Sequence, residues 1–167
     1  MTTRFVGAAV PALRMLLALG AAVSCAHAAD AEFAPQLWLN PGIYSYHFDR
    51  SQNFREDNVG IGAEVMLTPD HGVMAGTYVN SDRGRTRYGV YEWRPLHWNV
   101  AGADLSLALL MGAFDGYPRY RNGGWFLAAM PVLAIEGKRF GVNLGIIPTI
   151  KDRLEGAIAV QVKLRVW

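Results

Sequence analysis

The chain lacks several features that would place it in common protein classes. It has one cysteine in 167 residues, Cys25, so no disulfide within the chain can form. No segment offers about 18 consecutive uncharged apolar residues, so no membrane-spanning helix is predicted. The formal net charge is only +2, and Arg4 and Arg14 near the amino terminus account for this excess. The rest of the chain is electrically balanced, which argues against nucleic acid as a partner.

Signals for metal or nucleotide chemistry are also missing. His71 and His97 fall in expected turns, and no group of His, Asp and Glu has the spacing of a metal site. No glycine-rich loop leads into a helix, as a phosphate-binding loop would. We therefore expect no metal, no cofactor and no nucleotide substrate.

The first 28 residues have the pattern of an export signal. They carry two arginines, a short apolar core at 15–23 (MLLALGAAV) and a small-x-small cleavage pattern at 26–28 (AHA). Cleavage there would remove the cysteine and leave equal numbers of basic and acidic side chains. The alternative is a lipoprotein-type signal with Cys25 acylated, against which Ala22 argues, because that position usually holds a large aliphatic residue.

From about residue 43, apolar residues alternate with polar or small ones. In 59–67 (VGIGAEVML) the odd positions are apolar, and two glycines and Glu64 lie between them. The same period of two recurs in 104–112, 140–147 and 157–167. This period is typical of strands, because successive side chains of a strand point to opposite faces.

Turn signals divide this part of the chain into eight expected strands. The turns are rich in Gly, Pro, Asn and Asp and lie at 69–72, 82–85, 95–103, 116–124 and 136–138. The expected strands are 43–49, 59–68, 73–81, 86–94, 104–115, 125–135, 139–148 and 156–167. Eight antiparallel strands in about 140 residues match the smallest outer-membrane barrels. We predict an all-β, eight-stranded antiparallel up-and-down β-barrel of outer-membrane type at 43–167, after a short segment at 29–42.

Periodicity alone leaves the direction of the apolar face open. A soluble sandwich or lipocalin-like barrel would bury that face, whereas a membrane barrel would turn it toward lipid. Aromatic residues near the expected strand ends favour the membrane barrel, because such residues suit the membrane interfaces. They are Trp93, Trp98, Trp125, Trp167, Tyr44, Tyr78, Tyr88 and Tyr120.

The carboxyl-terminal residue does not fit this pattern. Trp167 is in phase with Lys163 and Arg165, one residue out of register with the apolar positions of the last expected strand. A slip of one residue exchanges the two faces of a strand. Either the last strand ends before Trp167, or the membrane interpretation is wrong.

Five short stretches, in this order and at these spacings, resemble the lipid A palmitoyltransferase family of outer-membrane enzymes. They are SYHFD (45–49), VNS (79–81), WRPL (93–96), MPVLA (130–134) and IIP (146–148). The resemblance covers roughly residues 43–150. It implies a barrel in the bacterial outer membrane that holds an acyl chain in its upper lumen. Such an enzyme transfers an acyl group from a phospholipid to lipid A or a related glycolipid of lipopolysaccharide, without metal or cofactor, and we expect a monomer.

The resemblance also implies a catalytic set. His47 and Ser81 match the family's histidine and serine, and Asn80 takes the place of its aspartate. An amide can orient a histidine but cannot neutralise an imidazolium, so an enzyme with Asn80 is expected to be slow. Asp49 or Asp82 could serve instead, although neither matches the pattern. The structural alternatives are a polar rim histidine for His47 and strand-to-loop turn chemistry for Asn80 and Ser81.

The chain departs from the family pattern at two further places, and it offers prolines and arginines as candidate lipid-binding residues. The family's amphipathic helix before the barrel has little room in 29–40, and Asn58 stands where a proline is usual. Pro131 and Pro148 are expected to interrupt the barrel wall and admit lipid laterally; strand-end or bulge prolines are the alternative. Loop arginines are expected to meet lipopolysaccharide phosphates, or else to pair with nearby acids. They are Arg83, Arg85, Arg87, Arg119 and Arg121.

Two functions remain open from the sequence. The first is acyl transfer, with His47 as base and Ser81 assisting. The second is a non-enzymatic outer-membrane barrel, structural or lipid-binding, that keeps the scaffold without the chemistry. Glu64, Glu92 and Arg94 are expected to form an inner polar network, because a narrow barrel must pair its buried charges. A soluble lipid-binding barrel ranks third.

Overall fold

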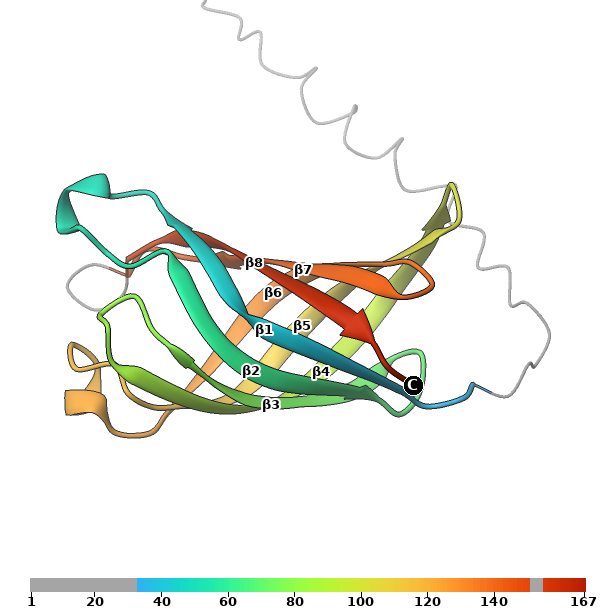
Figure 1. Ribbon diagram of the computed structural model, residues 1–167, viewed down its shortest axis with the longest axis horizontal. Helices are drawn as coiled ribbons and strands as arrows, with labels where there is room; N and C mark the ends of the chain where they lie inside the picture. Colours follow the sequence, from blue (N-terminus) through green and yellow to red (C-terminus); the bar gives the residue numbers. More distant parts are fainter. Residues whose placement is uncertain (1–32, 151–154) are drawn as a thin grey trace, which may run out of the picture. The chain divides into compact units, whose positions relative to one another are not determined.

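The computed structural model describes residues 33–150 and 155–167, which form one closed barrel of eight antiparallel strands in chain order (Figure 1). The strands are β1 (Gln36–His47), β2 (Asp57–Met66), β3 (His71–Val79), β4 (Arg85–Val100), β5 (Ala103–Phe114), β6 (Phe126–Glu136), β7 (Phe140–Ile147) and β8 (Ala157–Arg165). Two short 3-10 helices, η1 (Arg50–Gln52) and η2 (Arg121–Gly123), interrupt the connections. None of the described helices is long and apolar enough to cross a membrane. The predicted all-β barrel is confirmed; the expected signal at 1–28 and Cys25 lie outside the described residues.

Two strand boundaries differ from the prediction by more than two residues, both near prolines. β1 begins at Gln36 rather than at 43, because the β1–β2 ladder continues across Pro41 through an irregular register between Asn40 and Gly42. Gly42 adopts a φ of 120°, a conformation that glycine tolerates and other residues rarely adopt. Residues 36–40 are therefore strand, not helix, and the segment expected to precede the barrel is partly barrel wall.

The second difference lies in β4, which continues to Val100 instead of ending at 94. A register shift between Trp93 and Leu96 absorbs Pro95 as a bulge, where the missing N–H costs no ladder bond. The expected turn at 95–103 shrinks to Ala101 and Gly102, both with positive φ. A tight two-residue hairpin turn of this kind requires positive φ.

The connections sort into two kinds at opposite ends of the barrel (Figure 1). Longer loops at 48–56, 80–84 and 115–125 lie at one end, which we name the loop end. Tight turns at 67–70, 101–102 and 137–139, with the first residue of β1 and the last of β8, lie at the other, the turn end. This asymmetry is typical of small outer-membrane barrels.

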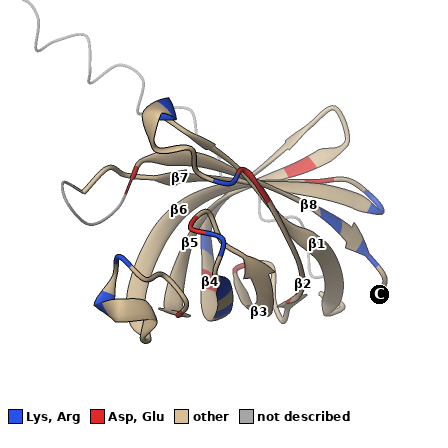
Figure 2. Cartoon of the chain, turned by 60° about the vertical axis from the view of Figure 1, so that its left-hand side comes forward, with Lys and Arg blue, Asp and Glu red and all other residues tan. Residues whose placement is uncertain are grey.

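The apolar face of the strands points outward. On β2, Val59 and Ile61 are 56% and 68% exposed, whereas Asn58 and Glu64 are buried inside. The ribbon is largely uncharged along β3, β5, β6 and β7 (Figure 2). A soluble barrel has the opposite polarity, with apolar residues inside and polar residues facing water.

β8 resolves the question raised by the last residue. The strand ends at Arg165, and its outward positions Ile158, Val162 and Leu164 are apolar. Trp167 lies two residues beyond the strand with its side chain 71% exposed, and its carbonyl accepts a hydrogen bond from the Leu37 amide at 2.8 Å. The last strand thus ends before Trp167, as the first of the two sequence alternatives requires.

Candidate functional site

The lumen near the turn end holds a buried ionic network, which we name the charged floor and define as Glu64, Glu92, Arg94, Glu136 and Lys163. Arg94 donates to all three carboxylates, at 2.8 Å to Glu64 and 2.9 Å to Glu92 and Glu136. Lys163 Nζ lies 2.5 Å from both Glu64 Oε1 and Glu136 Oε1. The predicted contacts of Glu64 and Glu92 with Arg94 are confirmed, and two further charges complete the network.

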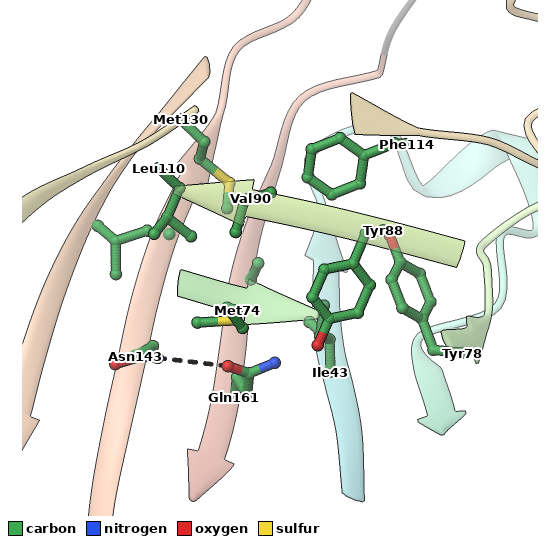
Figure 3. A pocket seen from close by; sticks show the side chains of 13 residues that line it. Ile43, Met74, Tyr78, Tyr88, Val90, Leu110, Phe114, Met130, Asn143 and Gln161 are labelled. Atoms are coloured by element: carbon green, nitrogen blue, oxygen red, sulfur yellow. Dashed lines mark hydrogen bonds between the residues drawn. The ribbon is translucent and has the colours of Figure 1, made fainter. Parts of the chain in front are cut away.

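Above the floor the lumen becomes apolar. A cavity of about 50 Å³, the apolar chamber, lies here. Its lining is mostly aliphatic and aromatic: Ile43, Met74, Tyr78, Tyr88, Val90, Leu110, Phe114, Met130, Val132, Gly145 and Ala159, with Asn143 and Gln161. In Figure 3 the rings of Tyr78, Tyr88 and Phe114 gather on one side with Ile43 beside them. Met74, Leu110 and Met130 lie on the other side, and the bonded amide pair lies at the bottom. Asn143 also donates to Glu64 at 3.0 Å, so the amides mark the boundary with the floor.

Loop 115–125 covers the chamber toward the loop end. The hydroxyls of Tyr117 and Tyr78 lie 2.8 Å apart, and Tyr78 also lines the chamber. The rings of Tyr117 and Tyr120 pack edge-on against Phe126. Burial raises the pKa of Tyr117, so its hydroxyl stays protonated and able to donate.

The barrel wall beside the chamber is incompletely paired. Among the described residues, β6 pairs with β7 only from Val132 to Glu136, and the β6 residues up to Pro131 have no β7 partner. Pro148 follows the last residue of β7. The two prolines therefore flank a stretch of wall at the loop end without ladder hydrogen bonds, next to Met130, which lines the chamber.

His47 ends β1 at the barrel mouth and is buried. Its ring stacks on Phe54, with 4.7 Å between the ring centroids. Its Nδ1 atom is buried without a hydrogen-bond partner among the described residues. His47 also borders a polar cleft of about 470 Å³ formed largely by loop 48–56, with Arg83 from the neighbouring loop. Stacking therefore orients the ring where a carboxylate was expected to do so.

Ser81 joins this mouth through a second side chain of β1. Its Oγ lies 3.4 Å from Ser45 Oγ, and Ser45 Oγ accepts a hydrogen bond from Asn58 Nδ2 at 2.6 Å. The Ser81 carbonyl accepts from the Arg55 amide at 3.0 Å, which ties the loop carrying Ser81 to loop 48–56. Ile43, Ser45 and His47 are successive inward positions of β1, so chamber, serine pair and histidine follow one another toward the loop end.

Asn80 has a different environment from the one that the resemblance implies. Its amide donates to Thr86 Oγ1 at 3.0 Å and to the Gly116 carbonyl at 2.7 Å, and its Oδ1 accepts from the Gly84 amide at 2.9 Å. It is fully buried. Both amide hydrogens are therefore already engaged, and Asn80 links the β3–β4 loop to the loop that covers the chamber.

The two candidate substitute acids also have local partners. Asp49 caps η1 by accepting from the Ser51 hydroxyl and amide, and these bonds hold the pKa of Asp49 below its usual value. Asp82 forms an ion pair with Arg119 at 3.3 Å. Of the two acids, only Asp49 borders the cleft with His47.

Most of the candidate loop arginines bind other loop residues. Arg83 donates to the Asn53 carbonyl at 3.0 Å, and Arg121 to the Trp125 carbonyl at 3.4 Å. Arg87 binds Asp115 through its backbone and its guanidinium. Arg119 pairs with Asp82 and covers the Phe54 ring at 5.0 Å.

Arg85 differs from the other four arginines. It is exposed, and its side chain has no hydrogen bond or ion pair within the described residues. Of the five, it is therefore the cation whose charge is best placed to meet an external anion, whereas the others must exchange an existing partner. Also within the described part, no three His, Cys, Asp or Glu side chains are grouped as metal ligands.

The chain has no significant match to a protein-family model or to a curated protein.

Sequence reasoning missed several residues of this region. Ser45 lay inside one of the quoted stretches, but only its inward position, two residues from His47, marks it as a candidate. Asn58 was noted only as a departure from a proline. Tyr117 carried no signal, because its loop had no expected structure. Glu136 and Lys163 occupy positions that the alternation predicts to face inward. The contacts of Lys163 with Glu64 and Glu136 form only when the sheet closes into a barrel, so the sequence did not indicate them.

Proposed function

We propose that this chain is an outer-membrane barrel that transfers an acyl chain from a phospholipid to lipid A or a related glycolipid. The observation that carries the proposal is the sequence of environments along the inner face of β1. An apolar chamber beside an unpaired stretch of wall leads to a polar mouth that holds His47 and Ser81. A lipid ester needs both environments, one for its chain and one for its reacting carbonyl group.

The exterior supports placement in a membrane. Aromatic side chains are exposed near both rims, as in the interfacial girdles of membrane barrels. They are Tyr44, Tyr46, Phe48 and Trp125 at the loop end, and Trp93, Trp98, Phe140 and Trp167 at the turn end. Between them the exposed residues are chiefly aliphatic, such as Ile61 and Leu127. The turn end would face the periplasm and the loop end the outside, because outer-membrane barrels have short periplasmic turns.

The chemistry requires no group beyond those at the mouth. His47 takes the proton of the acceptor hydroxyl as its oxygen attacks the ester carbonyl carbon of the phospholipid. Ser81 donates a hydrogen bond to the carbonyl oxygen, on which negative charge develops. When the original ester C–O bond breaks, His47 returns the proton to the departing glycerol oxygen. One ester is thereby exchanged for another, with no net change in protons.

A second candidate function is a non-enzymatic barrel, structural or lipid-binding. The observation that favours it is that both Asn80 amide hydrogens are already used, one by Thr86 Oγ1 at the start of β4 and one by the Gly116 carbonyl. No carboxylate is hydrogen-bonded to His47 within the described residues, so a developing imidazolium would receive less support than in a complete triad. This candidate keeps the membrane placement and the chamber.

The membrane placement is tested by fractionating cells that express the full chain and by gel migration of unheated and heated samples. We expect the protein in the outer-membrane fraction and a faster migration before heating, because a closed barrel remains compact in detergent. Recovery in the soluble fraction would contradict the placement.

The reaction is tested by comparing lipid A masses from cells that express wild type, His47→Ala or Ser81→Ala. We expect an added acyl mass in wild type that both substitutions abolish or strongly reduce. His97→Ala is the matched control, because His97 lies at the turn end, bonded to Asp70 and Ser106. Correctly folded wild-type barrel without added mass would contradict the enzyme and favour the second candidate.

A further inference from the structure

The mouth contains a polar cluster that adds two residues, Ser45 and Asn58, to the proposed catalytic set. Ser45, Asn58 and His47 are each at least 94% buried, and they come from β1 and β2. Two of their atoms, Asn58 Oδ1 and His47 Nδ1, have no hydrogen-bond partner within the described residues. Buried polar atoms without partners are rare, and two in one cluster at the barrel mouth indicate a functional demand on the site.

The direction of the hydrogen bonds in this cluster is determined at one end. The Asn58 Nδ2 atom is a donor only, so Ser45 Oγ must accept at 2.6 Å. The hydrogen of Ser45 is then free to point elsewhere, and Ser81 Oγ lies 3.4 Å away. When Ser45 donates to Ser81, the hydrogen of Ser81 is in turn free for a ligand.

We infer that Asn58 is a positioning residue that, through Ser45, directs the Ser81 hydroxyl hydrogen toward the ester carbonyl oxygen of the acyl donor. The inference depends on the proposed acyl transfer and states in which direction the hydrogen bonds from Asn58 through Ser45 to Ser81 run. Asn58 acts through Ser45 and does not touch the reacting atoms. The arrangement also explains how Ser81 can be oriented although Asn80, its neighbour in the chain, is fully engaged in the loops.

Replacing Asn58 by aspartate, which accepts where the amide donates, should reverse the direction of the hydrogen bonds from Asn58 to Ser81. In Asn58→Asp, the Ser45 hydroxyl donates to the carboxylate, so Ser45 Oγ accepts from the Ser81 hydroxyl and the Ser81 hydrogen is drawn away from the ester. We expect kcat to fall at least about tenfold with little change in KM, because the lost bond is strongest to the charge of the transition state. Asn58→Leu, which has no hydrogen-bonding group, gives a second variant of similar size should the buried carboxylate impair folding.

The diagnostic measurement is the double mutant. Ser45→Ala alone is expected to lower kcat about threefold, since Ser81 loses its orienting donor. Ser45→Ala added to Asn58→Asp is expected to restore kcat to the Ser45→Ala level, because a reversed relay without its middle member no longer withdraws the hydrogen. Two independent structural roles would instead add their losses. Ser106→Ala, an equally buried serine at the turn end, is the control.

The assay uses the full-length purified barrel in detergent with phospholipid and lipid A, and gel migration confirms folding of each variant. Rescue in the double mutant supports the relay; additive losses overturn it. If folded wild type shows no transfer, the proposed function fails, and the relay is judged separately by NMR in the same micelles. Ser45→Ala must then shift the side-chain amide signals of Asn58, and Ser106→Ala must not. Unchanged Asn58 signals in Ser45→Ala overturn the relay.

Discussion

The two halves of the lumen differ in the side chains that the strands turn inward: the charged floor is ionic and the apolar chamber is aromatic and aliphatic. In the charged floor, two cations and three carboxylates from four strands pair with one another with little solvent, and of the carboxylate oxygens Glu92 Oε2 is buried without a partner among the described residues. In the apolar chamber, inward residues of the same strands are aromatic or aliphatic and leave a cavity. The difference teaches that paired charges fill the lumen at the floor, whereas the apolar side chains of the chamber leave a cavity of about 50 Å³.

The two halves also differ in how much a single substitution should cost. Each charge of the floor depends on partners across the barrel, so removing one leaves another buried and unpaired. In the chamber, neighbours can shift into space that is already present. We therefore expect the floor to dominate stability and the chamber with its mouth to dominate activity.

The largest effect is expected from Lys163→Met. The substitution leaves Glu64 and Glu136 with only Arg94 as a cationic partner, and breaking a buried ion pair costs about 3–5 kcal/mol. Urea unfolding in lipid vesicles, followed by tryptophan fluorescence, measures this loss. Lys138→Met in the exposed β6–β7 turn is the control and should remain close to wild type. A loss below about 1 kcal/mol for Lys163→Met would show that the floor contributes little to stability.

The next largest effect is expected from Asn80→Asp, which restores the aspartate that the resemblance places in the catalytic set. The structure predicts destabilisation, because a carboxylate cannot donate to Thr86 Oγ1 or to the Gly116 carbonyl. Losing two buried hydrogen bonds costs about 2–3 kcal/mol, and loop 115–125 should become more susceptible to protease. Asn122→Asp, an exposed change in that loop, serves for comparison. If Asn80→Asp proves as stable as wild type and gains transferase activity, the structural role of Asn80 is refuted.

Two glycines, Gly62 and Gly89, test how tightly the lumen is packed around Tyr88, which lines the chamber. A Cβ on Gly62 would lie 2.3 Å from the Tyr88 hydroxyl, whereas one on Gly89 meets nothing within 4 Å. Gly62→Ala should therefore lose about 1–3 kcal/mol through overpacking, and Gly89→Ala should be neutral. The same urea titration compares them. Equal stability of the two variants would mean that Tyr88 can move aside without cost.

The smallest effect is a pH dependence outside both halves, at Asp115. Burial raises the pKa of Asp115, but the hydrogen bonds and charge of Arg87 outweigh this and lower it below its usual value. Because the folded pKa lies below the unfolded one, the stabilisation is complete above about pH 4 and is lost as the pH falls further. The partly exposed pair should contribute below about 1 kcal/mol.

Unfolding between pH 5 and 3 tests this contribution. Asp115→Asn should remove the acid loss, and Arg87→Gln should reduce it by a smaller amount, because the backbone N–H of residue 87 still donates to Asp115. A reduction by only one of them would show that Asp115 is stabilised by something other than the Arg87 side chain.

Much of the barrel was predictable because it depends on local patterns. Period-two alternation and turn residues placed all eight strands, with boundaries wrong mainly at Pro41 and Pro95, where bulges carry the ladder past a proline. The outward apolar face was predicted from aromatic residues near the strand ends. Trp93, Trp98, Trp125, Trp167 and Tyr44 are exposed, as that prediction requires. For Tyr78 and Tyr88 the prediction was wrong, because they fall on inward positions of β3 and β4 and line the chamber. The candidate site was harder to predict, since its resemblance-based members His47 and Ser81 are 34 residues apart, and the side-chain contacts of Ser81 run to Ser45 and through it to Asn58.

The sequence by itself determined the strand count, the parity of each strand and therefore which residues face the lumen, because alternation is a local property of an extended chain. Only the tertiary structure decided which inward residues meet across the lumen. Closure sets the register of each strand, and register brought Lys163 to Glu64, engaged both Asn80 amide hydrogens with Thr86 and Gly116, and joined Asn58 to Ser45. Contacts of this kind join strands distant in the chain, and no local pattern encodes them.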